Sequence, residues 1–287
     1  DEFAAMVARL ARKEWFTGRI SACGLLTATY LRLKNERHDE FLDLFCKLCR
    51  DDTPMVRRVA ARYLGTMLQN VVQVKGRPVL DTVVVQVFMP LFEEFSGTDQ
   101  PDSVRLQTTE NCVALGRVLT NLEKPLRDNE LQLLKRVLPL IVATIDDRSW
   151  RVRWTAASKF ADVIAAYDTL PETMEQLVPA YEKLLQDPEA EVRTAATFNL
   201  AFVAQCNPQA RVPPATGGKD RVSVAERLVK KITSLTEDDS EHVRAALAMV
   251  ATELAPVLGT NATITYLVPP VLLLLRDAAS EVRLNLI

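Results

Sequence analysis

The sequence predicts an all-α solenoid of about seven antiparallel helix pairs, with no β-sheet. Three observations favour this fold: one motif recurs along the chain, apolar residues recur at helical spacing, and glycine and aromatic residues are scarce. Hydrophobic residues make up 48% of the 287 positions, which is ample for a buried core. The 9 glycines and the aromatic content of 6% disfavour all-β folds and glycine-loop nucleotide folds.

The recurring motif is an aspartate followed six residues later by an arginine, which is usually preceded by valine. In its fullest copy, Ser149 is expected to cap a helix that starts at Trp150. The six copies are Asp51 with Arg57, Asp99 with Arg105, Asp147 with Arg153, Asp187 with Arg193, Asp238 with Arg244, and Asp277 with Arg283. Successive arginines lie 39 to 51 residues apart. This period is expected of HEAT-type helix pairs, which are roughly 40–47 residues long.

Apolar spacing predicts two helices in each copy of the motif. In the central copy, one face of the first helix carries Leu134, Leu138, Ile141 and Ile145. One face of the second helix carries Val152, Ala156, Phe160, Val163 and Ile164. Two such helices cannot bury their apolar stripes alone, so neighbouring pairs are expected to stack. Prolines recur in the first helix and are expected to kink it at Pro90, Pro139, Pro179 and Pro269.

The predicted domain is one continuous array of seven pairs, at about 1–33, 36–70, 80–120, 129–167, 172–206, 222–257 and 263–287. The first pair departs from the motif, because Lys13 and Gly18 replace its aspartate and valine. Both ends are apolar, so the last pair is expected to be truncated and the chain to be an internal piece of a longer solenoid. Two linkers, 71–79 and 207–220, are expected to lengthen the joins between pairs.

Composition narrows the class of protein and its location. The net charge of −2 and the pI near 5.9 argue against a nucleic-acid platform. Five cysteines, an odd number without a dense framework, favour reduced thiols and a cytoplasmic location, with a nuclear one also open. No signal peptide is visible, and the longest apolar run near the end, 267–275, is far short of the ~20 residues of a membrane span. No membrane partner is therefore expected.

Residues that could carry chemistry are sparse, so an enzyme, a cofactor and a metal site are not expected. The two histidines, His38 and His242, lie in different repeats, and His242 is expected at the surface beside Glu241. Cys46 and Cys49 form a single CxxC without a second ligand pair, which indicates core packing rather than zinc. The Gly-Gly-Lys sequence at 217–219 lacks the spacing and the preceding strand of a phosphate loop.

The aspartates and arginines of the motif are expected to form a structural ladder. Each aspartate would cap a helix N-terminus, and each arginine would reach the aspartate of the same repeat or of the next. Individual exposed ion pairs contribute only ~0–1 kcal/mol, so the ladder would fix geometry more than stability.

Large side chains in the turns are harder to explain by packing. Trp15, Phe16 and Trp150 fall in or beside turns, and Arg58 and Arg151 add charge beyond the ladder arginine. Exposed tryptophan and arginine dominate protein–protein hot spots, so a binding ridge is predicted there. The alternative, that each tryptophan packs over its neighbouring turn, stays open.

Several segments resemble the scaffold (A) subunits of protein phosphatase 2A, a family of HEAT-repeat proteins. They are 14–25 (EWFTGRISACGL), 51–58 (DDTPMVRR), 147–153 (DRSWRVR), 189–193 (EAEVR) and 281–285 (EVRLN). The resemblance implies a non-enzymatic scaffold whose turns hold a regulatory (B-type) subunit. The contacts carried over by matching position are Trp15, Phe16, Pro54, Arg57, Arg58, Ser149, Trp150 and Arg151. It also implies that the catalytic subunit binds C-terminal repeats that this chain does not contain.

Departures from the family pattern are the two linkers and Lys230, which stands where other repeats have proline, and they indicate a divergent member. The runner-up hypothesis is a HEAT or armadillo adaptor, or a nuclear transport receptor, that binds other protein partners. Receptors of that kind display tryptophan and asparagine ladders or acidic surfaces on the second helix. Here Trp154 is the one such candidate beside the ladder.

Overall fold

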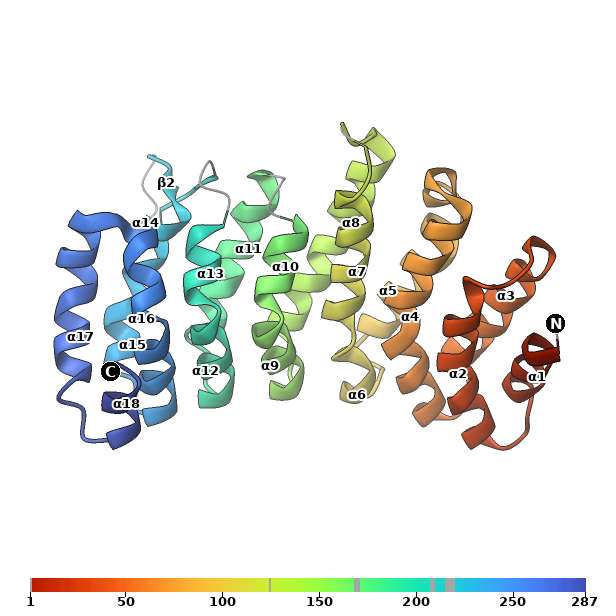
Figure 1. Ribbon diagram of the computed structural model, residues 1–287, viewed down its shortest axis with the longest axis horizontal. Helices are drawn as coiled ribbons and strands as arrows, with labels where there is room; N and C mark the ends of the chain where they lie inside the picture. Colours follow the sequence, from red (N-terminus) through yellow and green to blue (C-terminus); the bar gives the residue numbers. More distant parts are fainter. Residues whose placement is uncertain (1, 124, 168–170, 207–209, 215–219) are drawn as a thin grey trace. The chain divides into compact units, whose positions relative to one another are not determined.

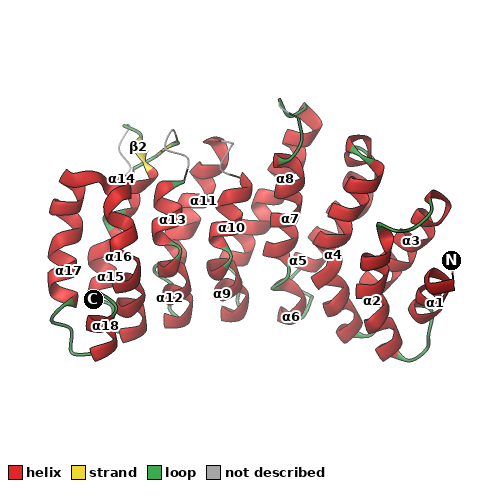
Figure 2. Cartoon of the chain, in the orientation of Figure 1, coloured by secondary structure: helices red, strands yellow, loops and turns green. Residues whose placement is uncertain are grey.

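The computed structural model describes residues 2–123, 125–167, 171–206, 210–214 and 220–287. The described chain is almost entirely helical, which confirms the all-α prediction (Figure 1 and Figure 2). Its contacts divide into two compact units, Asp1–Thr144 and Ile145–Ile287, and each unit is described by itself. The division into one array of seven pairs therefore stays a prediction.

Unit 1 consists of helices joined by short turns. They are α1 (Glu2–Ala11), α2 (Phe16–Tyr30), η1 (Asn35–Arg37), α3 (His38–Cys49), α4 (Pro54–Lys75), η2 (Arg77–Leu80), η3 (Val84–Phe88), α5 (Met89–Ser96), α6 (Asp102–Arg105), α7 (Thr108–Thr120) and α8 (Asp128–Ile145), which ends at the unit boundary. The second helices of successive pairs, α2, α4 and α7, lie side by side, and the first helices pack against them (Figure 1).

The contact between α4 and α7 depends on a buried glycine and a buried asparagine. A Cβ atom at Gly65 would lie 2.7 Å from Cβ of Ala114, so only glycine lets the two helices approach this closely. The Asn111 side chain accepts a hydrogen bond from the Gly65 backbone N–H at 2.9 Å and donates one to the Ala61 carbonyl at 3.1 Å. Asn111 thereby joins α7 to two backbone groups that lie one turn apart on α4.

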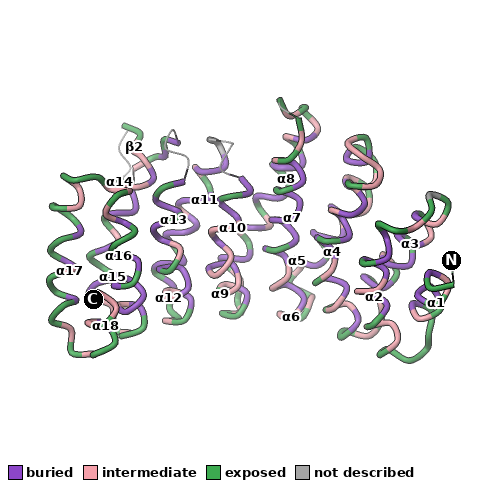
Figure 3. The backbone as a smooth tube through the Cα atoms, in the orientation of Figure 1, coloured by how far each residue is buried: buried purple, intermediate pink, exposed green. Residues whose placement is uncertain are grey.

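Unit 2 repeats the same arrangement. It contains α9 (Trp150–Ser158), α10 (Phe160–Tyr167), α11 (Pro171–Leu184), α12 (Ala190–Phe198), α13 (Leu200–Gln205), β1 (Arg211–Val212), β2 (Val222–Ser223), α14 (Val224–Leu228), α15 (Lys231–Thr236), α16 (Glu241–Ala262), η4 (Thr263–Leu267), α17 (Val268–Leu274) and α18 (Ser280–Leu284). Helices α9, α12 and α16 lie side by side, and buried positions line the contacts between helices (Figure 3). The apolar stripe predicted on the central second helix, Val152 to Ile164, is buried.

Two second helices of unit 2 are broken where continuous helices were expected. Lys159 separates α9 from α10, and Asn199 separates α12 from α13. A break leaves carbonyl groups without their intrahelical partners. The Asn199 side chain donates to the Ala157 carbonyl, just before the first break, at 2.8 Å.

The recurring prolines have two different local structures. Pro139 and Pro179 lie inside the continuous helices α8 and α11. Pro90 and Pro269 instead follow the π-helical turns η3 and η4, which each end two residues before the proline. Proline removes an N–H group from the helical ladder, and a widened turn is one way to accommodate that loss.

The predicted linkers need correction. At 71–79, helix α4 continues to Lys75 with Val71 fully buried, and the chain turns at Gly76, whose φ is 74°. The segment holds no glycine or proline before Gly76, so nothing ends the helix earlier. In the second linker, residues 207–209 and 215–219 lie outside the described residues. The flanking strands β1 and β2 pair antiparallel, which is a small departure from the expectation of no β-sheet.

The stretch Glu241–Leu274 is long and apolar enough, by length and composition, to cross a membrane. Its mean hydropathy is 1.5 over the most apolar window. The stretch is not one straight helix, however, because Gly259 adopts a φ of 74° and interrupts α16. The α16 residues Leu247 and Leu254 are buried within the unit. The structure therefore places a helical hairpin of a repeat here.

Candidate partner-binding surface

The turns within the helix pairs share one set of hydrogen bonds. The motif aspartate accepts, through Oδ1, the backbone N–H two residues later at 2.7–2.9 Å, in the turns of Asp51, Asp147, Asp187, Asp238 and Asp277. The motif arginine donates from Nη1 to the carbonyl of its own aspartate at 2.6–2.8 Å, for Arg57, Arg153, Arg193, Arg244 and Arg283. Each turn is therefore fixed at both ends by its own motif.

The same arginines connect one turn to the next. In the described chain, bidentate pairs join Arg19 to Asp51, Arg153 to Asp187, Arg193 to Asp238 and Arg244 to Asp277, with Nε–Oδ2 distances of 2.6–2.7 Å. These side chains are mostly buried, at 13–18% exposure for arginine and 5–9% for aspartate. The hydrogen bonds from Arg244, against the opposing effect of burial, lower the pKa of Asp277. The sequence left open whether each arginine contacts the aspartate of its own repeat or that of the next. In the structure the arginine donates to the backbone carbonyl of its own aspartate and to the side-chain carboxylate of the next one.

Arg19 is a ladder residue that the motif did not identify. It donates to the carbonyls of Lys13 and Glu14 and to the carboxylate of Asp51. The replacement of the aspartate by Lys13 has little effect on this interaction, because the acceptor there is the backbone. A signal was present in the sequence, since Arg19 precedes Arg57 by nearly the period of the other arginines.

The third turn differs from the others. The residue two after Asp99 is Pro101, which has no N–H to donate, so the turn of the other repeats cannot form around Asp99. Arg105 donates to the carbonyl of Gln100, five residues earlier, just as Arg57 donates to the carbonyl of Asp52, the residue after its aspartate. Both Nε of Arg57 and Oε1 of Gln100 are buried without a hydrogen-bond partner among the described residues. In that part of the chain, the ladder is thus interrupted after Arg57.

The expected helix caps are only half correct. Thr53 and Ser149 occupy the N-cap positions of α4 and α9, but neither side chain makes the capping hydrogen bond. The Thr53 hydroxyl instead accepts a hydrogen bond from Arg19 at 3.1 Å. The preceding aspartate already holds the backbone N–H of the cap residue, which fixes the turn without the hydroxyl group.

Two turns of unit 1 present candidate binding side chains next to each other. Trp15, the residue before α2, is 77% exposed, which excludes packing over the neighbouring turn. Phe16 and Pro54 begin α2 and α4 and are also exposed, as is Arg58. Arg19 joins the two turns through Asp51, so these side chains share one surface.

Arg57 is less suited to binding than its neighbour. Its Nη1 donates to the carbonyls of Asp51 and Asp52, and its Nε is buried. The guanidinium group is therefore largely part of the turn. Arg58 is exposed and, among the described residues, has no ion-pair partner, so it is the better candidate for a partner contact.

The third candidate turn lies in unit 2. Trp150, the first residue of α9, is 39% exposed, so it is partly covered and partly accessible. The guanidinium carbon of Arg151 lies 5.3 Å from the centre of the Trp150 ring, a cation–π contact. Ser149 is half-buried beside them. Because this turn belongs to the other unit, its position is described separately from the turns of Trp15 and Pro54.

The residues that were weighed for chemistry occupy structural positions. His38 is buried, with Nε2 at 3.1 Å from the Tyr30 carbonyl, whereas His242 is exposed. Burial raises the pKa of the Cys46 thiol to about 11, and that of Cys49 further. Among the described residues, no group of histidine, cysteine and acidic side chains could hold a metal ion. The Gly-Gly-Lys sequence at 217–219 lies outside the described residues.

Comparison with known proteins identifies the relatives of this chain. A model of the PPP2R1A-like HEAT repeat matches residues 171–259, and a HEAT-repeat model matches residues 41–71. The chain is 37% identical over 286 residues to the beta isoform of the human 65 kDa regulatory A subunit of serine/threonine-protein phosphatase 2A. That alignment covers 99% of this chain and 43% of the human protein. The chain is a HEAT-repeat protein homologous to the A subunits of protein phosphatase 2A.

Two further comparisons support this relationship and the fold. The A-subunit homologue is 35% identical over 159 residues to the PP2A regulatory A subunit of Schizosaccharomyces pombe. That alignment covers 55% of this chain and 24% of the Schizosaccharomyces pombe protein. It therefore spans less than half the length of these relatives. One solved structure with a similar fold describes how Kap95p binding changes the switch loops of RanGDP. The alignment covers 98% of this chain and 40% of the matching chain in that structure. Its TM-score is 0.53 at 12% identity, which shows a shared fold alone.

Proposed function

We propose that this A-subunit homologue is a non-catalytic scaffold in the assembly of protein phosphatase 2A. The observation that carries the proposal is its similarity to A subunits over 99% of its length. A scaffold supplies no chemistry, but it raises the effective concentration of the subunits that it holds and fixes their orientation. Its location is proposed to be the cytoplasm, with the nucleus as a second compartment, because an odd number of cysteines without a dense framework suits a reducing environment.

The regulatory (B-type) subunit is proposed to bind the exposed turns. In unit 1 the contacts would come from Trp15, Phe16, Pro54 and Arg58, and in unit 2 from Trp150 and its neighbours Ser149 and Arg151. Arg57 supports this surface from within the turn. The catalytic subunit is proposed to bind repeats that match the part of the relatives outside this chain.

The test compares turn variants in binding to a purified B-type regulatory subunit by biolayer interferometry. We expect Trp15→Asp, Arg58→Glu and Trp150→Asp each to weaken binding by about tenfold or more, because exposed tryptophan and arginine dominate interface energies. Phe3→Asp is the matched control, since Phe3 is an exposed aromatic of α1 that lies outside the turns. Helical circular dichroism confirms that each variant is folded. Wild-type affinity in the folded turn variants, or no binding by the wild type, would contradict the proposal.

A further inference from the structure

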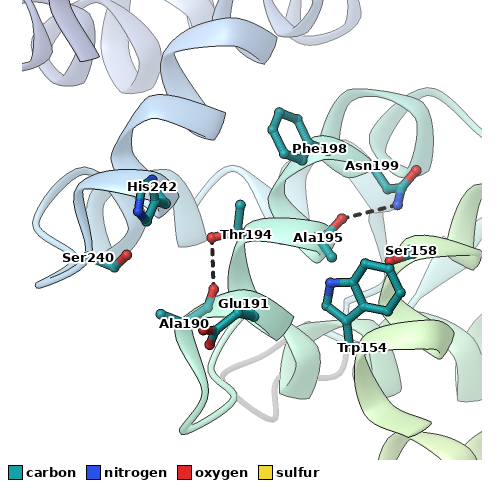
Figure 4. A pocket seen from close by; sticks show the side chains of 10 residues that line it. All are labelled: Trp154, Ser158, Ala190, Glu191, Thr194, Ala195, Phe198, Asn199, Ser240 and His242. Atoms are coloured by element: carbon teal, nitrogen blue, oxygen red, sulfur yellow. Dashed lines mark hydrogen bonds between the residues drawn. The ribbon is translucent and has the colours of Figure 1, made fainter. Parts of the chain in front are cut away.

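A pocket of about 440 Å³ lies on the second helices of unit 2, and its Trp154 follows the turn residue Trp150 by one helical turn on α9. Its lining comes from three successive helices, with Trp154 from α9, Glu191 and Phe198 from α12, and His242 from α16. Figure 4 shows Trp154 on one side and His242 on the other, with Thr194 and Ala195 of α12 between them. The pocket is therefore a product of stacked repeats.

The apolar part of this surface is larger than packing within the unit requires. Trp154 is 44% exposed and Phe198 is 47% exposed. Phe202, four residues after Phe198, and Met249, seven residues after His242 on α16, are also exposed large hydrophobic side chains. We call Trp154, Glu191, Phe198, His242 and their neighbours Phe202 and Met249 the second-helix groove. Several exposed large apolar side chains on neighbouring helices of one unit mark a candidate interaction site.

The polar atoms of the second-helix groove favour an extended chain as the occupant. Within the described residues, the Trp154 indole N–H, the Ser158 hydroxyl and the His242 ring have no hydrogen-bond partner. An extended peptide carries unpaired backbone N–H and C=O groups that these side chains can satisfy, whereas the backbone of a helix is already satisfied. The indole N–H at the groove is therefore suited to a backbone carbonyl of the occupant.

The charge of the groove favours a basic occupant. Glu191 lines the pocket, and Glu253 follows Met249 by one helical turn on α16. Both carboxylates are exposed, and neither has an ion-pair partner in the part of the chain that the structure describes. The nearby ladder arginines do not neutralise them, because Arg153 and Arg193 are held by the aspartates of the next turns.

We propose that the second-helix groove binds an extended segment of a partner protein in which a large apolar side chain adjoins lysine or arginine. The apolar side chain lies between Trp154 and Phe198, and the adjoining cation pairs with Glu191. The Trp154 ring adds a cation–π surface, and its N–H donates to the peptide backbone. The lining of this pocket contains none of the turn residues proposed to bind the regulatory subunit.

The experiment measures fluorescence anisotropy of a labelled short peptide that has one phenylalanine flanked by lysine and arginine. We expect saturable binding by the wild type, about tenfold weaker binding by Trp154→Ala, and several-fold weaker, less salt-dependent binding by Glu191→Gln. Tyr266→Ala is the matched aromatic control, because Tyr266 is exposed in the same unit outside this pocket. Glu281→Gln is the matched charge control, because Glu281 precedes Arg283 as Glu191 precedes Arg193. Both controls should bind as the wild type does.

Several results would overturn the proposal. They are absence of saturable binding by the folded wild type, equal binding of a peptide with glutamate in place of the basic residues, and wild-type affinity in folded Trp154→Ala. Sedimentation velocity tests whether a second copy of this chain occupies the groove instead. A wild-type dimer that Trp154→Ala converts to a monomer would assign the groove to that second copy. The two surfaces are distinguished by crossing the variants. Trp154→Ala should retain binding of the regulatory subunit, and Trp15→Asp should retain binding of the peptide.

Discussion

At the scale of single residues, the ladder shows how one proline changes its neighbours. The sequence motif treats Asp99 and Arg105 as equivalent to the other copies, because the spacing of six residues is kept. Pro101 removes the N–H that the aspartate carboxylate accepts in the other turns. The consequence lies in the preceding repeat, where Arg57 keeps a buried Nε without an acceptor among the described residues. Spacing alone cannot predict this, because it concerns side chains more than forty residues apart.

We expect Gln100→Glu to stabilise unit 1. Glutamate has nearly the shape of glutamine and would offer Arg57 a charged acceptor, which strengthens a hydrogen bond. The gain should be about 1 kcal/mol in the free energy of unfolding, measured by urea unfolding near neutral pH. Gln86→Glu, at an exposed position of η3, is the control and should change little. An unchanged unfolding midpoint for Gln100→Glu would show that a carboxylate at residue 100 does not pair with Arg57.

At the scale of the helix, periodicity predicted the buried apolar stripes well, because helix formation and the apolar stripe are local properties. The stripes on the central pair, Leu134 to Ile145 and Val152 to Ile164, are buried as expected. The breaks at Lys159 and Asn199 and the π-helical turns before Pro90 and Pro269 were not predicted. They depend on which backbone groups form hydrogen bonds with the neighbouring helix. The Ala157 carbonyl, for example, accepts a hydrogen bond from the Asn199 side chain.

Two glycines in the middle of helices in unit 1 should respond in opposite ways to alanine. At Gly65 a Cβ would meet Cβ of Ala114 at 2.7 Å, so Gly65→Ala should destabilise the unit although alanine favours helix by about 1 kcal/mol. At Gly24 the nearest atoms, at 3.1 Å, belong to the end of the Tyr63 ring, which can move. Gly24→Ala should therefore be neutral or stabilising. Thermal unfolding measures the midpoint of each variant against that of the wild type. A raised midpoint for Gly65→Ala would contradict the close α4–α7 contact.

At the scale of the whole molecule, the ladder makes stability depend on pH. Burial raises the pKa of Asp238, but hydrogen bonds from Arg193 and from the Ser240 N–H outweigh it, so the pKa lies below its ordinary value. The pKa of Asp277 is also lowered, chiefly by Arg244. Unfolded aspartate titrates near 3.9, so these carboxylates stabilise the fold above that pH. The stabilisation is lost as the pH falls through the lower folded pKa values.

We expect Asp277→Asn to lower the free energy of unfolding by roughly 1–3 kcal/mol at pH 7, because it removes a charged hydrogen-bond acceptor from a mostly buried pair. The difference from the wild type should begin to shrink below about pH 4, where the carboxylate of the unfolded wild type is protonated, and it should vanish below the lower pKa of the folded state. Urea unfolding at neutral and acidic pH measures both values. Asp43→Asn, which removes an exposed pair with Lys47 on α3, should change stability little at either pH. An equal loss for Asp277→Asn at both pH values would contradict the ladder as the cause.

The apolar stripes of the helices, the phase of the turns and the residues that the turns expose could be predicted from the amino-acid sequence alone. These features repeat with a fixed period and depend on neighbours within a few positions. The tertiary structure decided which aspartate each arginine pairs with, where the ladder is interrupted, and that Trp154, Phe198 and Glu191 share one groove. These outcomes depend on stacking, which brings together side chains such as Arg153 and Asp187 from successive repeats, and local periodicity carries no information about that distance.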